Sequence, residues 1–282
     1  MTKLQKFHVV QMPQLRVVPT EQVILHESFD TKRTTKLKKK IIESGKWKDP
    51  PIVTRLQDGR YMVVDGANRT TSMKALNIPH MLVQEVDYFD PSIRLKSWNH
   101  AVRLPIDELT EVLKRDTRIS LRRMTDTQAK KLLSKRKILG YLCGRNGTAF
   151  ALPIQKSASE ALSVLNCLAD EYEGKSVIHR TEDSTHRAFH GLSKQMKTLV
   201  VYPALTKKGI LSAIERGQYL PSGISRHLVL RRALRVWLPL SVLRSRTLTL
   251  RQKQARVDAL IAKLFKEGKV RYYPEGIYLF DE

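Results

Sequence analysis

The chain has few cysteines and no long hydrophobic run. Cys143 and Cys167 are the two cysteines among 282 residues, and they show no metal-ligand spacing. This count favours reduced, buried side chains over a disulfide framework, a metal site or a redox pair. No apolar run approaches the roughly 20 residues that span a membrane, and the N-terminal residues lack the apolar segment of a signal peptide. We therefore expect a soluble, cytoplasmic protein with no membrane partner.

Acidic residues are scarce as well. The chain has 27 Asp and Glu against 51 Lys and Arg, which gives a formal net charge of +24. Such an excess favours polyanionic partners, namely nucleotides, nucleic acid or an acidic surface. The basic residues form several clusters along the chain, and each cluster alone is more simply a solvated face. Their sum predicts nonspecific affinity for nucleic acid, although one nucleotide site does not require so large a charge.

The hydrophobic residues that are present make up 41% of the chain, enough for a folded core. A chain of 282 residues holds one large or two modest domains. Strand and helix patterns alternate over the first hundred residues, and this predicts an α/β (α+β) fold. Asp90-Pro91 and Pro105 mark a boundary region, so we expect one domain over 1–100 and another over 101–282. The expected strands are 15–18, 23–25, 52–56, 60–64, 80–86 and 234–238, and the expected helices are 34–44, 70–76, 106–114, 126–134, 157–171, 206–216 and 248–265.

Two hairpins are expected in the second half of the chain. Apolar runs at 138–143 and 148–152 flank Asn146-Gly147, a dipeptide that favours a type I′ turn. A second hairpin is expected over 270–280, around Pro-Glu-Gly. A β-hairpin after residue 105 argues against a DNA-reading helix-turn-helix in this part of the chain.

The segment 63–76 is the most informative part of the sequence. It consists of a short apolar strand, a glycine turn and a helix that opens with three hydroxyl residues. Backbone N–H groups at the positive end of a helix dipole, next to an arginine, form an anion site that commonly holds phosphate. The pattern alone also fits a plain strand–turn–helix with a surface arginine. The predicted phosphate-binding residues are Asp65, Gly66, Ala67, Asn68, Arg69, Thr70 and Thr71.

The order of segments around this loop resembles the ParB/sulfiredoxin-like superfamily. An extended segment, a basic helix, an apolar strand and an Asp58-Gly59 turn precede the loop. Many members of that superfamily carry a DGxHR or GxxR loop that binds nucleotide phosphates. Within it, the chain is similar to the free L-serine kinases of the staphyloferrin B siderophore cluster and to archaeal free-serine kinases. The stretches that carry the likeness are 25–29, 59–66, 83–85, 97–100, 220–227 and 236–243.

This resemblance implies a fold and an activity. It implies an N-terminal ParB/sulfiredoxin-like nucleotide-binding domain packed on a mixed α+β C-terminal domain that contributes to the substrate site. The implied reaction is the transfer of a phosphoryl group from ATP or ADP to free L-serine, which gives O-phospho-L-serine for siderophore or 2,3-diaminopropionate biosynthesis. Magnesium is the implied cofactor, and the Asp65 carboxylate is its candidate ligand, unless that carboxylate holds the loop instead.

The resemblance also implies roles for single residues. Glu27 corresponds to the catalytic glutamate that accepts the proton of the seryl hydroxyl. Without the resemblance, Glu27 is more simply a surface carboxylate. Core packing explains Trp98 as well as a role in substrate binding does. Asn68 departs from the family pattern, which usually has histidine there, and an amide cannot shuttle a proton. The implied substrate-binding residues are Trp98, His100, Ser225, Arg226 and His227.

A second hypothesis belongs to another functional class. The basic helices could contact phosphodiester backbones, which would make the chain a ParB-like DNA-binding regulator of transcription or partition that uses nucleotide as a ligand. The hairpin expected at Asn146-Gly147 favours the enzyme.

Overall fold

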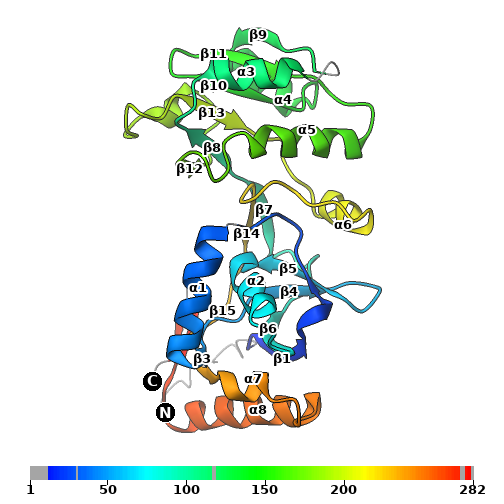
Figure 1. Ribbon diagram of the computed structural model, residues 1–282, viewed down its shortest axis with the longest axis vertical. Coiled ribbons are helices and arrows are strands. Elements are labelled where there is room, and N and C mark those ends of the chain that lie inside the picture. Colours follow the sequence, from blue (N-terminus) through cyan, green and yellow to red (C-terminus); the bar gives the residue numbers. More distant parts are fainter. Residues whose placement is uncertain (1–11, 30, 116–118, 274–276, 281–282) are drawn as a thin grey trace, which may run out of the picture. The chain divides into compact units, whose positions relative to one another are not determined.

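The chain folds into two compact units, and the first unit is discontinuous in sequence. The computed structural model describes residues 12–29, 31–115, 119–273 and 277–280. The first unit comprises the described parts of 1–24, 31–93 and 229–282, and the second comprises those of 25–30 and 94–228. The mixed α/β class predicted from the sequence is confirmed (Figure 1). The sequence predicted that 229–282 would belong to the second domain, whereas the structure groups the described part of this segment with the first unit.

A five-stranded mixed sheet forms the core of the first unit. Its order is β1-β6-β4-β5-β2, in which the pairs β1/β6 and β4/β5 are antiparallel and the pairs β4/β6 and β2/β5 are parallel. Tyr61 to Val64 of β5 are all buried, which shows that both faces of the central strands are covered. The strands are β1 (Gln14–Pro19), β2 (Val23–Ile24), β4 (Ile52–Arg55), β5 (Tyr61–Asp65) and β6 (His80–Glu85).

Helices from both ends of the sequence cover this sheet. Helix α2 contacts β5, α7 contacts β6 and α8 contacts β1, while α1 packs against α2. Within the residues that the structure describes, no helix is long and apolar enough to cross a membrane. The helices of this unit are the 3-10 turn η1 (Thr20–Gln22), α1 (Thr31–Ser44), α2 (Ala67–Ala75), α7 (Leu240–Arg244) and α8 (Leu250–Lys266).

A buried lysine joins α8 to the rest of the first unit. The side chain of Lys253 is fully buried, and its ammonium group donates to Leu243 O at 2.8 Å, to Ser245 O at 2.6 Å and to His80 Nδ1 at 2.8 Å. Burial lowers the pKa of Lys253. Two of the three acceptors are carbonyl groups at the end of α7, so this side chain takes the place of a helix C-cap.

The segment between the second unit and α7 departs from the sequence prediction. We expected one strand over 234–238, but the structure has β15 (Arg232–Leu234) and β16 (Leu238–Pro239) instead. Arg235 and Trp237 have φ values of 55° and 54°, and this left-handed backbone interrupts the strand. β15 pairs with β18 (Ile277–Phe280), which pairs with β17 (Val270–Tyr273), and β16 pairs with β3 (Lys46–Trp47). The turn of the predicted 270–280 hairpin, 274–276, lies outside the described residues.

The second unit is built on a six-stranded antiparallel sheet. Its order is β12-β8-β13-β10-β11-β9. A separate antiparallel pair consists of β7, which precedes the strands of this sheet in the sequence, and β14, which follows them. The strands are β7 (Arg94–Ser97), β8 (Asn99–Val102), β9 (Arg122–Thr125), β10 (Gly140–Gly144), β11 (Thr148–Leu152), β12 (Ile178–Thr181), β13 (Thr198–Val201) and β14 (Ser225–Leu228). The helices are α3 (Ile106–Arg115), α4 (Asp126–Ser134), α5 (Ala158–Asp170), η2 (His186–Phe189) and α6 (Lys207–Glu215).

The predicted hairpin at Asn146-Gly147 is present, with a different turn. β10 and β11 pair antiparallel, and Gly147 N donates to Gly144 O at 3.1 Å. Gly147 has a φ of 78°, whereas Asn146 does not have the positive φ that a type I′ turn requires. The type I′ assignment is therefore wrong. Asn146 instead accepts the N–H of Thr148 through its side chain at 3.0 Å, which fits a three-residue loop that ends in a left-handed glycine.

Candidate functional site

The predicted phosphate loop joins β5 to α2 in the first unit. Gly66 has a φ of 105°, and a Cβ placed there would lie 2.8 Å from Arg69 Nη2 and 2.9 Å from Pro51 Cβ. Only glycine suits this conformation and this spacing. No side chain caps the start of α2. A helix start without a side-chain cap is suited to binding an anion.

Asp65 and Arg69 face each other across this turn. Arg69 Nη2 donates to Asp65 Oδ2 at 3.0 Å, and the guanidinium of Arg232 forms an ion pair with the same oxygen. A carboxylate oxygen that already receives two guanidinium groups is a poor ligand for magnesium. The described residues also contain no cluster of three His, Cys, Asp or Glu side chains that could hold a metal ion. The residues around Asp65 do not fit the predicted magnesium site.

The hydroxyl residues of α2 differ in what they bond. Ser72 is buried and donates to Thr34 O at 3.2 Å and Asn68 O at 2.8 Å, so its hydroxyl holds α2 against α1. Asn68 Oδ1 accepts from Thr34 Oγ1 at 3.2 Å. The hydroxyl oxygens of Thr70 and Thr71 are buried without a hydrogen-bond partner. Two unpaired hydroxyl groups beside uncapped helix N–H groups are consistent with an anion site in this turn.

The substrate residues predicted from the family likeness lie in the second unit, along the β7–β14 pair. Ser225 is opposite Ser97 and Arg226 is opposite Lys96 in the antiparallel register. Trp98 N donates to Ile224 O at 2.8 Å. The short segment 25–29 belongs to the same unit, where Glu27 forms a parallel β-bridge with Leu220. Residues from three distant parts of the sequence are thus held together by backbone hydrogen bonds.

Glu27 is hydrogen-bonded to a serine hydroxyl. Ser225 Oγ donates to Glu27 Oε2 at 2.7 Å, and His26 Nε2 lies 2.7 Å from the same hydroxyl oxygen. Since that hydroxyl donates its proton to Glu27, His26 Nε2 is the donor in the second bond. The ring of His227 meets the ring of His26 edge-on, with centroids 5.2 Å apart. The Glu27 side chain is 16% exposed, so its carboxylate is oriented and still reachable.

Arg226 is held by an aromatic ring and an acidic side chain. Its guanidinium carbon lies 4.3 Å from the centroid of the Trp98 ring, and it forms an ion pair with Glu182. Lys96 Nζ approaches the other oxygen of Glu182 at 2.6 Å. A guanidinium stacked on tryptophan has a fixed plane, which suits bidentate recognition of a carboxylate.

His100 has a different role from the one predicted. Its side chain is fully buried, and burial lowers its pKa to about 4, so the ring is neutral at pH 7. His100 Nε2 donates to Gly223 O at 3.0 Å, and Nδ1 accepts from Tyr172 OH at 3.0 Å. Both ring nitrogens are thus occupied by protein groups, and neither is left to bind a substrate. We therefore correct its assignment from substrate binding to positioning of the turn before β14.

Two further side chains hold that turn. Arg180 Nε donates to Gly223 O at 3.2 Å, and a Cβ at Gly223, whose φ is 68°, would collide with the Arg180 guanidinium. Glu173 accepts the N–H of Ser222, while its Oε1 is buried without a hydrogen-bond partner. Burial, with the charges of Asp170 and Glu27, raises the pKa of Glu173 to about 7. The Glu27 carboxylate is thus close enough to contribute to the raised pKa of Glu173.

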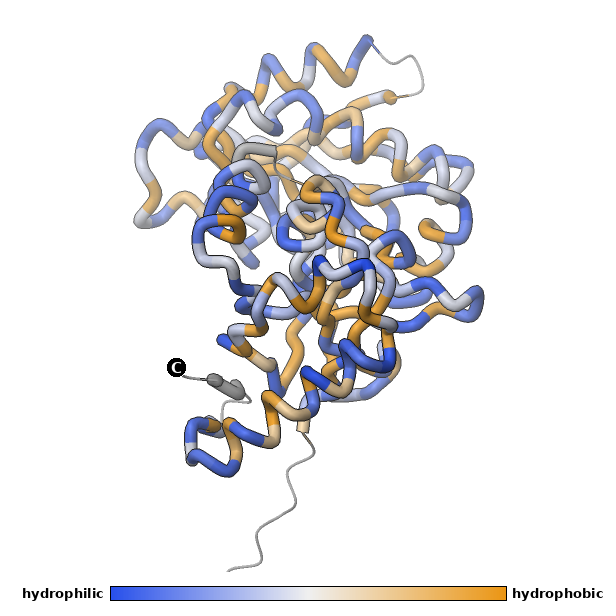
Figure 2. Tube along the Cα trace, turned by 60° about the horizontal axis from the view of Figure 1, so that its bottom comes forward, coloured by the Kyte–Doolittle hydropathy of each residue, from blue (hydrophilic) through white to orange (hydrophobic). Residues whose placement is uncertain are grey.

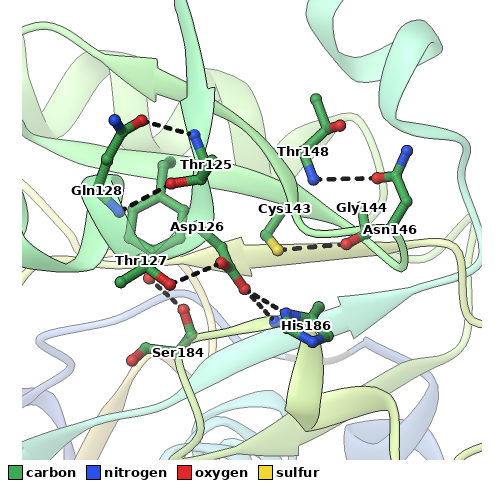
Figure 3. A network of polar contacts seen from close by, with 11 residues as sticks. Thr125, Asp126, Thr127, Gln128, Cys143, Gly144, Asn146, Thr148, Ser184 and His186 are labelled. Atoms are coloured by element: carbon green, nitrogen blue, oxygen red, sulfur yellow. Dashed lines mark hydrogen bonds and ion pairs between the residues drawn. The ribbon is translucent and has the colours of Figure 1, made fainter.

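Another polar network of the second unit is structural (Figure 3). Asp126, at the start of α4, accepts from the backbone N–H of His186 at 2.9 Å and lies 2.6 Å from its Nδ1. Thr125 and Gln128 form a capping box at the same helix terminus. Cys143 is buried nearby, and burial raises its pKa to about 12, which makes the thiol unreactive. This network holds α4 against the sheet.

The structure groups the predicted site residues by unit. Asp65 to Thr71 form one turn of the first unit, and Glu27, Trp98, Ser225, Arg226 and His227 are linked within the second. Sequence reasoning missed four participants: His26, Glu173, Glu182 and Arg232. His26 lies next to Glu27 and could have been included on that ground. The other three have no sequence pattern that separates them from surface charges.

Comparisons with known proteins show that the chain is similar to L-serine kinases. No family model matches the sequence. It is 29% identical over 272 residues to the ATP-dependent L-serine kinase SbnI of Staphylococcus aureus, covering 95% of this chain and 97% of that protein. It is 26% identical over 222 residues to the ATP-dependent L-serine kinase of Staphylothermus marinus, covering 76% of this chain and 84% of that protein.

Solved structures agree with the sequence relatives. A C-terminally truncated SbnI from Staphylococcus aureus superposes with a TM-score of 0.71 at 26% identity, covering 89% of this chain and 97% of that one. A free serine kinase in complex with AMP shares the fold, with a TM-score of 0.69 at 18% identity over 85% of this chain and 98% of that one. The chain is therefore similar, in sequence over nearly its whole length and in fold, to the L-serine kinase SbnI.

Proposed function

We propose that the chain is a kinase that transfers the γ-phosphoryl group of ATP to free L-serine. Two relatives named ATP-dependent L-serine kinases support the donor and the acceptor. The observation that carries the proposal is the hydrogen bond from Ser225 Oγ to Glu27 Oε2 at 2.7 Å. This contact reproduces within the chain what a general base requires of a seryl hydroxyl substrate: a short O–H···O bond to an oriented carboxylate.

In the proposed reaction, Glu27 is the catalytic base. Its carboxylate accepts the proton as the serine hydroxyl oxygen bonds to the γ-phosphorus. The bond from that phosphorus to the β–γ bridging oxygen breaks, and ADP leaves. The products are O-phospho-L-serine and ADP. Phosphoryl transfer depends mainly on positioning and charge neutralisation, so a single oriented carboxylate suffices as the base.

The remaining residues have binding roles in this proposal. The turn from Asp65 to Thr71 holds the phosphate groups of the nucleotide, with Asn68 offering an amide where the family usually has histidine. Arg226, which pairs with Glu182 in the structure, binds the carboxylate of serine in place of Glu182. Trp98 keeps the plane of the Arg226 guanidinium fixed. His227 follows Arg226 on β14, and its ring lies against the ring of His26. His100 positions the turn without touching the substrate.

The decisive experiment measures phosphate transfer with Glu27→Gln. Purified protein is incubated with γ-labelled ATP and a panel of free amino acids, and labelled O-phospho-L-serine is quantified. Glutamine keeps the shape of Glu27 and cannot accept the proton, so we expect kcat to fall about 100-fold or more while ATP affinity stays within about twofold of wild type. Glu21→Gln is the matched control, because Glu21 is exposed. Unchanged serine turnover in Glu27→Gln would remove Glu27 from the mechanism.

A further inference from the structure

Two arginines converge on one carboxylate in the first unit. Arg69, in the first turn of α2, and Arg232, in β15, both pair with Oδ2 of Asp65. They are far apart in the sequence, and each side chain is partly shielded, with 25% and 36% of it exposed. One carboxylate balances only one of two guanidinium charges. The cluster therefore carries a surplus positive charge beside the turn.

The donors of this cluster are incompletely used. The Nε atoms of Arg69 and Arg232 are buried and have no hydrogen-bond partner, and the same holds for the Thr70 and Thr71 hydroxyl oxygens. Thr70 is fully buried. Buried donors are normally satisfied, and leaving one unpaired destabilises the fold. Four such atoms around one turn indicate a site whose acceptor arrives with a ligand.

The backbone fixes Arg232 in this position. Gln84 is buried in β6, and its amide holds the chain on both sides of Arg232: Nε2 donates to Arg231 O at 2.8 Å, and Oε1 accepts from Ala233 N at 2.9 Å. Arg231 has a φ of 56°, in the left-handed region that residues other than glycine seldom adopt. A strained residue held by a buried amide is expected where a side chain must be placed accurately.

We propose that Arg232 is a second phosphate-binding arginine of the nucleotide site. The ligand is the di- or triphosphate tail of a nucleotide, whose oxygens pair with both guanidinium groups in place of Asp65. Asp65 is then a placeholder that keeps the arginines apart and oriented while no phosphate is bound. This inference rests on the proposed kinase function, since it extends the phosphate site of that function to a residue from the other end of the sequence.

Nucleotide binding without serine tests the inference. Isothermal titration of the full chain with ATP, ADP and adenosine is compared for wild type, Arg232→Gln and Arg232→Lys. We expect Arg232→Gln to weaken ATP and ADP binding at least tenfold and to leave adenosine binding within twofold. Arg232→Lys should recover only part of the loss, because an ammonium group cannot make two parallel hydrogen bonds. Arg235→Gln removes an exposed charge three residues away and should bind ATP like wild type.

The outcomes separate this inference from the kinase proposal. If Arg232→Gln binds ATP within twofold of wild type while wild type phosphorylates serine, Arg232 is not a phosphate ligand and the kinase proposal stands. An equal loss in Arg235→Gln would point to general charge and would also overturn the inference. If wild type binds no ATP, both proposals fail. Thermal melts with and without tripolyphosphate serve as a second readout. Tripolyphosphate should raise the melting temperature of wild type and Arg235→Gln more than that of a folded Arg232→Gln.

Discussion

At the scale of single residues, the unusual side chains are those that hold the turn before β14. Gly223 is contacted by His100 and Arg180, and Ser222 by Glu173. The sequence offered the Pro-Ser-Gly turn and the Ser-Arg-His stretch, but nothing that linked them to residues 100, 173 or 180. The likeness to serine kinases identified Glu27 and Ser225 separately. Their hydrogen bond depends on a β-bridge that no local pattern predicts.

Because the pKa of Glu173 is raised, we expect the stability of the protein to depend on pH. This pKa is raised from 4.5 to about 7, so the native state binds a proton more tightly than the unfolded chain does. This contribution to stability is complete below about pH 4.5 and is lost as the pH rises through about 7. Gln at this position mimics the neutral acid. We expect Glu173→Gln to melt within about 1 °C of wild type at pH 5 and roughly 2–4 °C higher at pH 8.

Differential scanning fluorimetry over pH 5 to 8 measures this difference. Glu171→Gln is the control, because Glu171 is on the same short segment and pairs with Lys175 at 3.7 Å near the surface. A constant gap between Glu173→Gln and wild type at all pH values would show that Glu173 does not titrate in this range.

At the scale of elements, the sequence predicted helices better than strands. The expected helix 126–134 matches α4 because Thr125 and Gln128 form a capping box that sets its start. The expected strand 234–238 was wrong because its apolar residues suit a strand while the backbone turns left-handed at Arg235 and Trp237. The pair β7–β14 joins segments far apart in the sequence, and such pairings follow from tertiary structure.

Lys253 tests how α7 and α8 are joined. We expect Lys253→Met to lower the free energy of unfolding by about 2–3 kcal/mol, because two buried carbonyl groups lose their donor. Lys263→Met is the control, since Lys263 is 67% exposed and pairs with Glu267 at 3.7 Å; a change below about 0.5 kcal/mol is expected there. Urea denaturation followed by circular dichroism measures both. Equal effects of the two substitutions would mean that the buried ammonium contributes nothing specific.

At the scale of the whole molecule, the net charge of +24 has no counterpart in the proposed reaction. Hydrophilic residues are distributed along the described chain rather than gathered in one segment (Figure 2). The described part of the second unit is built on a six-stranded antiparallel sheet. Nonspecific attraction of nucleic acid to this charge stays a prediction.

Salt separates the two possibilities. We expect affinity for a random DNA duplex to fall by roughly 100-fold or more from 50 to 200 mM NaCl, as counterion release requires, while serine phosphorylation falls less than about threefold. Fluorescence anisotropy with a labelled duplex and the phosphorylation assay are run in the same buffers. Tight binding to one defined sequence at 200 mM NaCl would favour a regulator over an enzyme.

The discontinuity of the first unit has a consequence for biosynthesis. Its sheet is encoded before residue 94, yet Arg232, α7 and α8 are encoded after the entire second unit. A ribosome must therefore complete the inserted unit before the nascent first unit receives its last layer. A truncated translation product that stops near residue 228 would lack Arg232. By our inference, it would bind the phosphate groups of a nucleotide more weakly even if the residues before 228 had folded.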